Sequence, residues 1–291
     1  MKSCDPLVTV ILPVFNGRKT LFAAVNSICQ QTYENWELLV LDDGSTDGSL
    51  ATASSFRDDR VIPVVRSNGQ GLTARLNQGI DLAKGRYIAR MDADDIAFPE
   101  RLARQVAYLE SHPVVDLLGT RAVVFRDDGS IVGLLPFSGT HDAICAHPWN
   151  NIPLPHPTWM GRREWFCKHR YHVPEYHRAE DQELLLRAHD SSRYACLPDV
   201  LLAYRQGGFS LKRTLTGRVG LLRAQWRYFL SHLDGISIIQ SIGIITGKVI
   251  VDLAASFPGA YNLYFMRMSE QPDKQSLQIL SRLLADYLIL K

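Results

Sequence analysis

The segment VTVILPVFNGRKTLFAAVNSICQQTYENWELLVLDDGSTDGS, residues 8–49, contains the pattern that decides the fold. Residues 8–13 are mostly β-branched or aliphatic and predict a strand, whereas residues 20–31 place apolar side chains at helical spacing. A second apolar run at 37–41 predicts another buried strand. Strand, helix and strand in this order indicate parallel strands of one sheet, with the connecting helix packed on a face.

The same alternation continues along the chain. Pro99 stands where proline is favoured, at the start of a helix, and Asp127-Asp128-Gly129 separates two apolar runs in the manner of a hairpin. The further predicted strands are 61–65, 86–91, 114–125, 131–135 and 194–204, the last interrupted by Pro198, and the further predicted helices are 50–56, 71–83, 99–111 and 180–188. Residues 136–157 predict a loop with one helical turn, and two or three amphipathic helices are expected beyond Thr214. This pattern predicts an α/β protein with a mostly parallel sheet, helices on both faces and a C-terminal helical extension.

The composition is that of a globular chain. The 291 residues are 46% hydrophobic and 21% charged, which excludes a disordered or fibrous protein. A formal charge of +2 gives no support to a general nucleic-acid binder, so no nucleic-acid partner is expected. Five cysteines without a C-x-x-C pair argue against a zinc ribbon or a disulfide scaffold and fit a reducing, cytoplasmic location.

The longest apolar stretch, residues 236–255, raises the question of a membrane. Gln240, Lys248 and Asp252 interrupt it, so no membrane-spanning helix is predicted. The mixture of apolar and basic residues beyond Thr214 is nevertheless typical of helices that rest on an anionic membrane. An ordinary helical cap on the catalytic domain, or a dimer contact, is the alternative. The expected location is cytoplasmic, with peripheral association at the inner face of the membrane as a further hypothesis.

Polar residues follow four of the predicted strands at the point where each strand ends. Because ligands of open α/β sheets bind outside the carboxyl ends of the strands, these residues are expected to form one site. The same residue types also form good turns and helix N-caps, which is the alternative interpretation of each segment alone. The four segments are 15–17 (FNG), 42–45 (DDGS), 68–71 (NGQG) and 92–95 (DADD).

The acidic residues at these strand ends indicate a hard cation. Carboxylate oxygens are the ligands that Mg²⁺ and Mn²⁺ prefer, and Mg²⁺ is commonly held by one or two carboxylates together with substrate phosphates. The chain has neither G-x-G-x-x-G nor G-x-x-x-x-G-K-[ST]. We therefore expect a nucleotide diphosphate to bind through a metal rather than through a glycine cradle, with a solvated loop at 92–95 as the alternative.

Residues 8–49, together with GLTARLNQGIDLAKGRYIARMDADDIAFPERL at 71–102, resemble the inverting family-2 glycosyltransferases of the GT-A fold. The resemblance covers residue 7 to about residue 210. It implies a Rossmann-like GT-A catalytic domain over 1–210, with a nucleotide-sugar-binding half at 1–112 and an acceptor-binding half at 113–210. Residues 211–291 would then form the C-terminal helical extension.

Carried over residue by residue, the resemblance assigns the donor site. Pro13, Phe15 and Asn16 match the loop that packs against the nucleoside. Asp43 matches the carboxylate that accepts a hydrogen bond from the base, and Arg75 matches a basic residue near the base and the phosphates. The alternative for Arg75 is a surface cation on an exposed helix face.

The resemblance also assigns the metal site. Asp92, Ala93 and Asp94 match the D-x-D motif, whose donor and metal contacts imply Mn²⁺ or Mg²⁺ as the cofactor. Asp94 is the expected direct metal ligand, and Asp92 the expected ribose or outer-sphere contact. Asp95 is expected to act as an N-cap or hydrogen-bond partner.

On the acceptor side, Glu180-Asp181 resembles the family's E-D motif, in which the Asp is the general base. Acids at a helix N-terminus are also favoured by the helix dipole, and both interpretations hold together. His156 and Trp159, with Glu180, are candidate acceptor contacts, although a structural role for His156 and partial burial of Trp159 are alternatives.

The chain departs from the family at one place. Many members carry a His shortly after a Tyr-Arg pair, whereas here Gln206-Gly207-Gly208 follows Tyr204-Arg205. This departure puts a metal role of the segment in doubt and leaves Arg205 as a candidate diphosphate partner.

The resulting function is that of an inverting, metal-dependent glycosyltransferase. It would transfer sugar from a UDP-, GDP- or dTDP-sugar to the hydroxyl of a saccharide or lipid-linked acceptor, in polysaccharide or glycolipid synthesis. One alternative is a metal-dependent nucleotidyltransferase, for which a Gly-rich phosphate loop with Arg or Lys would be expected after the first strand. The other is a non-catalytic nucleotide-sugar-binding protein.

Overall fold

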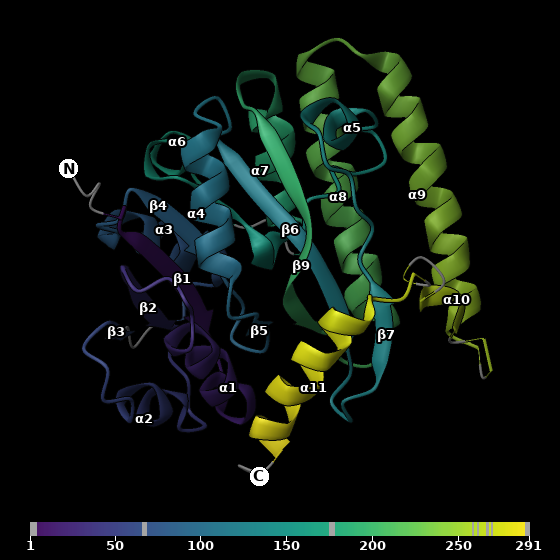
Figure 1. The fold of residues 1–291 in the computed structure, drawn as a ribbon. Coiled ribbons are helices and arrows are strands. Elements are labelled where there is room, and N and C mark those ends of the chain that lie inside the picture. The colour runs from purple at the N-terminus through teal and green to yellow at the C-terminus, as the bar shows by residue number, and fades with distance from the viewer. Residues whose placement is uncertain are drawn as a thin grey trace.

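The computed structural model describes residues 5–65, 69–174, 178–257, 259–260, 262–265, 268 and 270–288, so Asn68 of the third polar strand end lies outside the described residues. Within these ranges the strands form one nine-stranded sheet (Figure 1). The strands are β1 Val8–Val14, β2 Trp36–Asp42, β3 Val61–Val65, β4 Tyr87–Arg90, β5 Ile96–Ala97, β6 Leu117–Phe125, β7 Ile131–Leu134, β8 Met160–Arg162 and β9 Tyr194–Arg205. Their order is β3-β2-β1-β4-β8-β6-β9-β5, with β7 paired to β6.

The first half of the sheet is parallel, as the strand-helix alternation predicts. β1 lies between β2 and β4 and pairs in parallel with both, and β3 joins the far edge of β2. The carboxyl ends of β2, β1 and β4 therefore meet at one edge of the sheet. Three of the polar strand ends come together at this edge.

The second half of the sheet is mixed. β8 is antiparallel to β4 and to β6, whereas β6 and β9 run parallel, and β5 is antiparallel to β9. The pairing of β6 with β9 shifts register between Thr120 and Arg121, where Leu197 and Val200 are the successive partners. Pro198 falls in the skipped stretch because it has no backbone N–H to give to a ladder.

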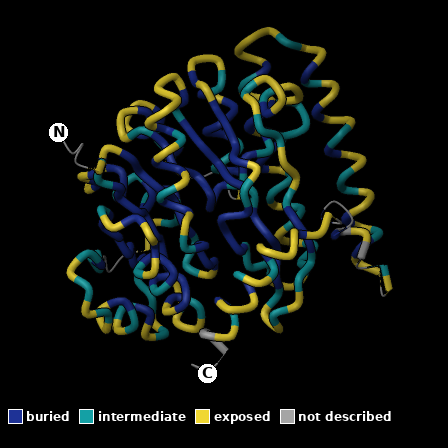
Figure 2. Tube along the Cα trace, in the orientation of Figure 1, coloured by how far each residue is buried: buried dark blue, intermediate teal, exposed yellow. Residues whose placement is uncertain are grey.

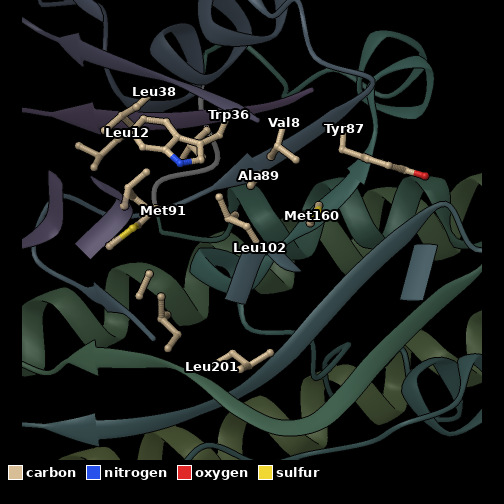
Figure 3. Packing of buried hydrophobic residues seen from close by; sticks show 14 of the residues in the cluster. Val8, Leu12, Trp36, Leu38, Tyr87, Ala89, Met91, Leu102, Met160 and Leu201 are labelled. Atoms are coloured by element: carbon tan, nitrogen blue, oxygen red, sulfur yellow. The ribbon is translucent and has the colours of Figure 1, made fainter. Parts of the chain in front are cut away.

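Helices cover both faces of the sheet, and side chains alternate between them. Val10 and Leu12 of β1 join one buried cluster with the first, second and fourth helices, part of which Figure 3 shows around Leu12. Ile11 joins another cluster with the third, sixth and seventh helices. The helices are α1 Arg18–Cys29, α2 Ser49–Ser54, α3 Leu72–Leu82, α4 Arg101–Ser111, α5 His141–Cys145, α6 Arg163–Lys168, α7 Glu180–Ala188, α8 Leu211–Ser231, α9 Gly235–Ala255, α10 Asn262–Phe265 and α11 Lys274–Leu288, with 3₁₀ turns at His156–Thr158 and His189–Ser191.

The C-terminal region contributes two different structures. α8 and α9 lie side by side at the edge of the molecule next to α7 (Figure 1). α11 instead returns to the sheet, where Leu280 and Leu283 pack with Phe98, Val123 and Phe125 in a separate buried cluster. The region that follows residue 210 is thus partly peripheral and partly integrated into the core.

By length and composition, α9 meets the requirement for a helix that crosses a membrane, with a mean hydropathy of 1.6 over its most apolar window. The two charged residues that argued against a membrane-spanning helix, Lys248 and Asp252, both form hydrogen bonds within the protein. Asp252 is buried and accepts hydrogen bonds from Arg218 Nε at 2.9 Å and Nη2 at 3.3 Å, and Lys248 Nζ donates to the Asn150 carbonyl at 3.1 Å. These contacts tie one face of α9 to α8 and to the loop after α5, while much of its other surface is exposed (Figure 2).

Gly85 provides a test of the close approach between β1 and β4. A Cβ at this position would lie 2.5 Å from the Thr9 amide nitrogen and 2.7 Å from the Leu7 carbonyl oxygen, both of which are backbone atoms. We expect Gly85→Ala to lower the free energy of unfolding by about 1–3 kcal/mol, measured by urea denaturation. Gly243→Ala, whose Cβ meets nothing within 4 Å on α9, is the control and should stabilise by up to about 1 kcal/mol. Equal stability of the two variants would contradict the predicted clash.

Candidate active site

The loops after β1 and β2 are joined into one unit at the carboxyl edge of the sheet. Asn16, with φ of 52°, accepts a hydrogen bond from the Thr46 amide on Oδ1 at 2.9 Å, and its own amide donates to Ser45 Oγ at 2.9 Å. The Gly17 amide donates to Ser49 Oγ at 2.9 Å. Asn16 therefore shapes this edge by holding two loops together.

The side chains around Asn16 differ in what they present to solvent. Pro13 is buried within β1, whereas Phe15 exposes 63% of its surface at the rim. A Cβ added at Gly17 would lie 3.7 Å from Cβ of Ala93, so the turn after β4 packs directly against this loop. Phe15 is thus the apolar surface available to a flat ring at this edge.

Asp42 and Asp43 have separate roles. Asp42 is buried, and its Oδ2 accepts the amides of Gly44 at 3.2 Å and Ser45 at 3.1 Å, which makes it the turn-forming residue. Asp43 turns toward α3, where its carboxylate accepts the amides of Gln70 at 3.0 Å and Gly71 at 2.9 Å.

Arg75 completes the environment of Asp43. Its Nε lies 3.0 Å from Asp43 Oδ1, and its terminal nitrogens donate to Gln70 at 2.9 Å and Gln78 at 2.6 Å. Only 1% of Arg75 is exposed, so the alternative of a surface cation is wrong. Helical periodicity could not reveal this, because α3 packs with the Arg75 face inward against the end of β2.

The D-x-D turn after β4 concentrates negative charge. Candidate ligand oxygens of Asp92, Asp94 and Asp95 all lie within 4.8 Å of one another. Arg90, which is buried at the end of β4, binds Asp92 with two contacts, Nη2 to Oδ1 at 2.5 Å and Nη1 to Oδ2 at 2.7 Å. Arg101 is also buried, and its Nη2 donates to the Arg90 carbonyl at 2.7 Å.

The other two carboxyl groups of the turn lack such a partner. Asp95 is fully buried, its Oδ1 accepts the Arg205 amide at 2.9 Å, and its Oδ2 has no hydrogen-bond partner among the described residues. Enclosure by the protein, and then the charge of Asp92, raises the pKa of Asp94 to about 6 and the pKa of Asp95 well above its usual range. Asp94 is exposed to solvent and lines a cavity. An unpartnered buried oxygen beside an accessible carboxylate fits a hard divalent cation.

One cavity of about 870 Å³ joins this turn to α7, because both Asp94 and Asp181 line it. Asp181 is the second residue of α7, which begins at Glu180 as predicted. Burial raises the pKa of Asp181, and hydrogen bonds from Gln182 with the charge of Arg90 partly offset that rise. Gln182 also exchanges hydrogen bonds with the backbone of Ile152 at 2.9 and 3.1 Å, which fixes α7 against the loop after α5.

The remaining acceptor candidates do not line the cavity. Trp159 is fully buried, and its indole N–H donates to the Leu154 carbonyl at 3.0 Å, so we do not propose an acceptor contact for it. His156 is buried with Nε2 2.6 Å from the Tyr171 hydroxyl, and burial, with the nearby charge of Arg90, lowers its pKa well below the usual value. Neither residue, nor Glu180, is among the lining residues of the cavity.

Arg205, the last residue of β9, forms hydrogen bonds with the acidic turn. Its Nε donates to the Asp94 carbonyl at 2.9 Å, and its Nη1 donates to Asp127 at 3.2 Å. Arg205 and the Gln206-Gly207-Gly208 segment after it line the cavity, in the place where the family pattern led us to look for a His.

Sequence reasoning missed two parts of this site. Arg90 carries a signal that could have been used, because an arginine at the end of a buried strand directly before an acidic turn needs a partner charge. The cavity face of α8 carries no such signal, since only the packing of α8 beside α7 brings it to the site.

Residues 9–170 match the family model described as Glycosyl transferase family 2. The chain is 35% identical over 214 residues to the putative glycosyltransferase EpsE of Bacillus subtilis, covering 72% of this chain and 76% of EpsE. It is 33% identical over 129 residues to the UDP-Glc:alpha-D-GlcNAc-diphosphoundecaprenol beta-1,3-glucosyltransferase WfgD of Escherichia coli, covering 44% of this chain and 50% of WfgD. The protein belongs to glycosyltransferase family 2.

Solved structures support the fold at low sequence identity. The structure of S. aureus TarS 1–349 in complex with UDP gives a TM-score of 0.57 at 18% identity, covering 96% of this chain and 79% of that one. The mannosyltransferase PcManGT of Pyrobaculum calidifontis, in complex with GDP-Man and Mn²⁺, gives a TM-score of 0.58 at 15% identity, covering 98% of this chain and 88% of PcManGT. The GT-A fold expected from the sequence is confirmed, and a glycosyltransferase rather than a nucleotidyltransferase is the class of enzyme.

Proposed function

We propose that the chain is an inverting glycosyltransferase that depends on Mn²⁺ or Mg²⁺. It moves a sugar from a UDP-, GDP- or dTDP-sugar to a hydroxyl of a saccharide acceptor, free or lipid-linked. The observation that carries the proposal is that Asp94 of the D-x-D turn and Asp181 of α7 line the same cavity. That arrangement provides a metal ligand and a proton acceptor on two sides of one space.

Donor recognition begins at Asp43. An ionised carboxylate has about four acceptor positions; the Gln70 and Gly71 amides take two of them, and Arg75 Nε forms an ion pair with Asp43 Oδ1 at 3.0 Å. The carboxylate therefore keeps acceptor capacity for a ring N–H of the base, such as N3–H of uracil or thymine. Phe15 would supply the apolar contact to the base, and Asn16 and Pro13 would hold the loop that presents it.

The acidic turn would hold the metal. Because Arg90 already binds both oxygens of Asp92, Asp94 is the better direct ligand, with Asp92 toward the ribose and Ala93 as the small residue between them. A bound divalent cation would offset the charge that develops on the leaving nucleoside diphosphate. Mn²⁺ in the similar PcManGT complex supports this role.

Asp181 is the proposed general base. As the acceptor oxygen forms its bond to the anomeric carbon, its proton passes to the Asp181 carboxylate, and the bond to the diphosphate oxygen breaks on the opposite face. That geometry inverts the anomeric configuration. The raised pKa of Asp181 makes its carboxylate a stronger base than an exposed aspartate.

We expect Asp94→Asn to abolish stabilisation by Mn²⁺ plus UDP or GDP, measured as a thermal shift. Asp59→Asn, the same change at an exposed turn, is the control. Metal-dependent stabilisation that survives in Asp94→Asn would remove Asp94 from the metal site.

Metal binding by the unmodified protein should also depend on pH. Protons compete with the metal because the pKa of Asp94 is raised to about 6. One unit below that pKa about nine-tenths of the carboxyl is protonated, so apparent metal affinity should fall about tenfold between pH 7 and pH 5.

Asp181→Asn should lower kcat at least about a hundredfold while donor affinity stays nearly intact, because the lost interaction belongs to the transition state. In the unmodified enzyme kcat should fall as pH falls through the raised pKa of Asp181, since only the ionised carboxylate accepts the proton. Transfer rate and donor binding are measured on one preparation. If Asp181→Asn transfers sugar at the wild-type rate, Glu180 becomes the candidate general base, and Glu180→Gln tests it. An unmodified protein that binds the nucleotide but transfers no sugar would favour the non-catalytic alternative.

An apolar surface on α8, α9 and their connection would place the enzyme at a membrane. Such large exposed patches mark interaction surfaces rather than ordinary solvent-facing helices. WfgD, by its name, acts on a diphosphoundecaprenol-linked acceptor, and such a hydrocarbon chain resides in a bilayer. The exposed residues are Val219, Trp226, Leu230, Leu233, Ile236, Ile239, Ile242, Ile250, Val251, Leu253 and Phe257.

Flotation with anionic liposomes at low salt tests the membrane association. Ile236 and Ile239 are each 73% exposed, and losing the burial of one such side chain costs about 1.5–3 kcal/mol. Ile236→Asp and Ile239→Asp should therefore each reduce partitioning at least about tenfold. Val114→Asp, at an equally exposed valine (73%) outside α8 and α9, is the control. A wild-type protein that stays in the soluble fraction and self-associates with concentration would support a dimer contact instead.

A further inference from the structure

One wall of the cavity is a face of α8. Ser210, Arg213, Thr214, Gly217, Arg218 and Leu221 line the cavity at spacings of three and four residues, which is the spacing of a single helix face. α8 lies beside α7, so this face is on the Asp181 side of the cavity, away from the donor residues at the ends of β1 and β2.

The charges on the cavity lining are unequal. Arg178, Arg205, Arg213, Arg218 and Lys248 line it, whereas Asp94 and Asp181 are its acidic residues among those the structure describes. Three of the basic residues are engaged by the protein. Arg205 binds the Asp94 carbonyl, Arg218 pairs with buried Asp252, and Lys248 donates to Asn150.

Arg178 and Arg213 differ from the other three. Both are exposed and line the cavity, and within the described ranges neither guanidinium forms an ion pair or a hydrogen bond. Arg178 lies three residues before Asp181, with φ of 62°, and its carbonyl oxygen lies 3.5 Å from the position of a Cβ at Gly217, one helical turn after Arg213. Arg178, just before α7, and Arg213, on α8, therefore line one cavity from two segments that pack against each other.

We propose that Arg178 and Arg213 bind a phosphate of the acceptor, so that the acceptor is a saccharide carrying a phosphate or diphosphate. Guanidinium groups match phosphate oxygens with paired hydrogen bonds, and a neutral saccharide would leave this positive excess without a counter-charge. The phosphate would sit beyond the acceptor sugar, whose reacting hydroxyl faces Asp181. This inference rests on the proposed function, since it names the acceptor of that reaction.

The donor diphosphate offers the same chemistry, so the test separates the two sources. The probe for the acceptor site is geranyl diphosphate, titrated calorimetrically in buffer with EDTA, where the metal-dependent donor site is not formed. The probe for the donor site is UDP or GDP with Mn²⁺. Arg178→Gln and Arg213→Gln should each weaken geranyl diphosphate binding at least about tenfold and leave nucleotide binding within about twofold. Arg223→Gln on the exposed side of α8 is the matched control and should change neither affinity.

Three results would overturn the inference. Wild-type protein that fails to bind geranyl diphosphate has no acceptor phosphate site. Variants that bind it as the wild type does show that the two arginines are not its ligands, and variants that lose metal-dependent nucleotide binding place them in the donor site. Arg213→Lys, which keeps the charge but not the paired geometry, should give an intermediate affinity. Nucleotide binding that stays intact in the Gln variants shows that they are folded. Because no probe is turned over, failure of this inference is distinct from failure of the proposed catalysis, which the transfer rate of Asp181→Asn measures.

Discussion

The ion pair between buried Arg90 and partly buried Asp92 is the interaction on which the rest of the site depends. The carboxylates of Asp92, Asp94 and Asp95 lie close together in one turn, and Asp181 is close enough for the charge of Arg90 to offset part of the rise in its pKa. Carboxylates so placed repel one another unless cations join them. Arg90 supplies one fixed positive charge inside the protein, and removing it would leave buried negative charge uncompensated. A second, exchangeable cation at Asp94 is then the natural complement, which is why this site suits a metal-bound diphosphate.

The two sides of the cavity have different origins in the fold. The proposed donor side lies at the carboxyl ends of β1, β2 and β4, where hydrogen bonds join the loops and fix Asp43 against α3. The proposed acceptor side lies at the start of α7 and on α8, which follows the last long strand. On this proposal, the parallel half of the sheet would bind the donor and the C-terminal helices would form the acceptor wall. Substrate differences between relatives are expected to arise mainly on this second side.

The sequence predicted the features that depend on local patterns. β1, β2 and β3 and the helix at Glu180–Ala188 were placed within about two residues because periodicity and turn residues mark them. The short strands Ile96–Ala97 and Met160–Arg162 were not predicted, since they have too few residues to form a pattern. In the site, the acidic turn and Asp181 were found through motifs, and the structure adds that they share a cavity. The burial of Arg75 and Trp159, and the internal partners of Lys248 and Asp252, depend on contacts between distant segments, which spacing along the chain does not reveal.

The central claim is that one cavity holds both the metal at Asp94 and the base Asp181. Anomalous diffraction at the manganese absorption edge, from crystals grown with Mn²⁺ and UDP or GDP, tests this claim most directly. The account predicts an anomalous peak in direct contact with the Asp94 carboxylate and with the diphosphate, in the space that Asp181 lines. A diphosphate bound with manganese at other ligands, or in a pocket that Asp181 does not face, would contradict it.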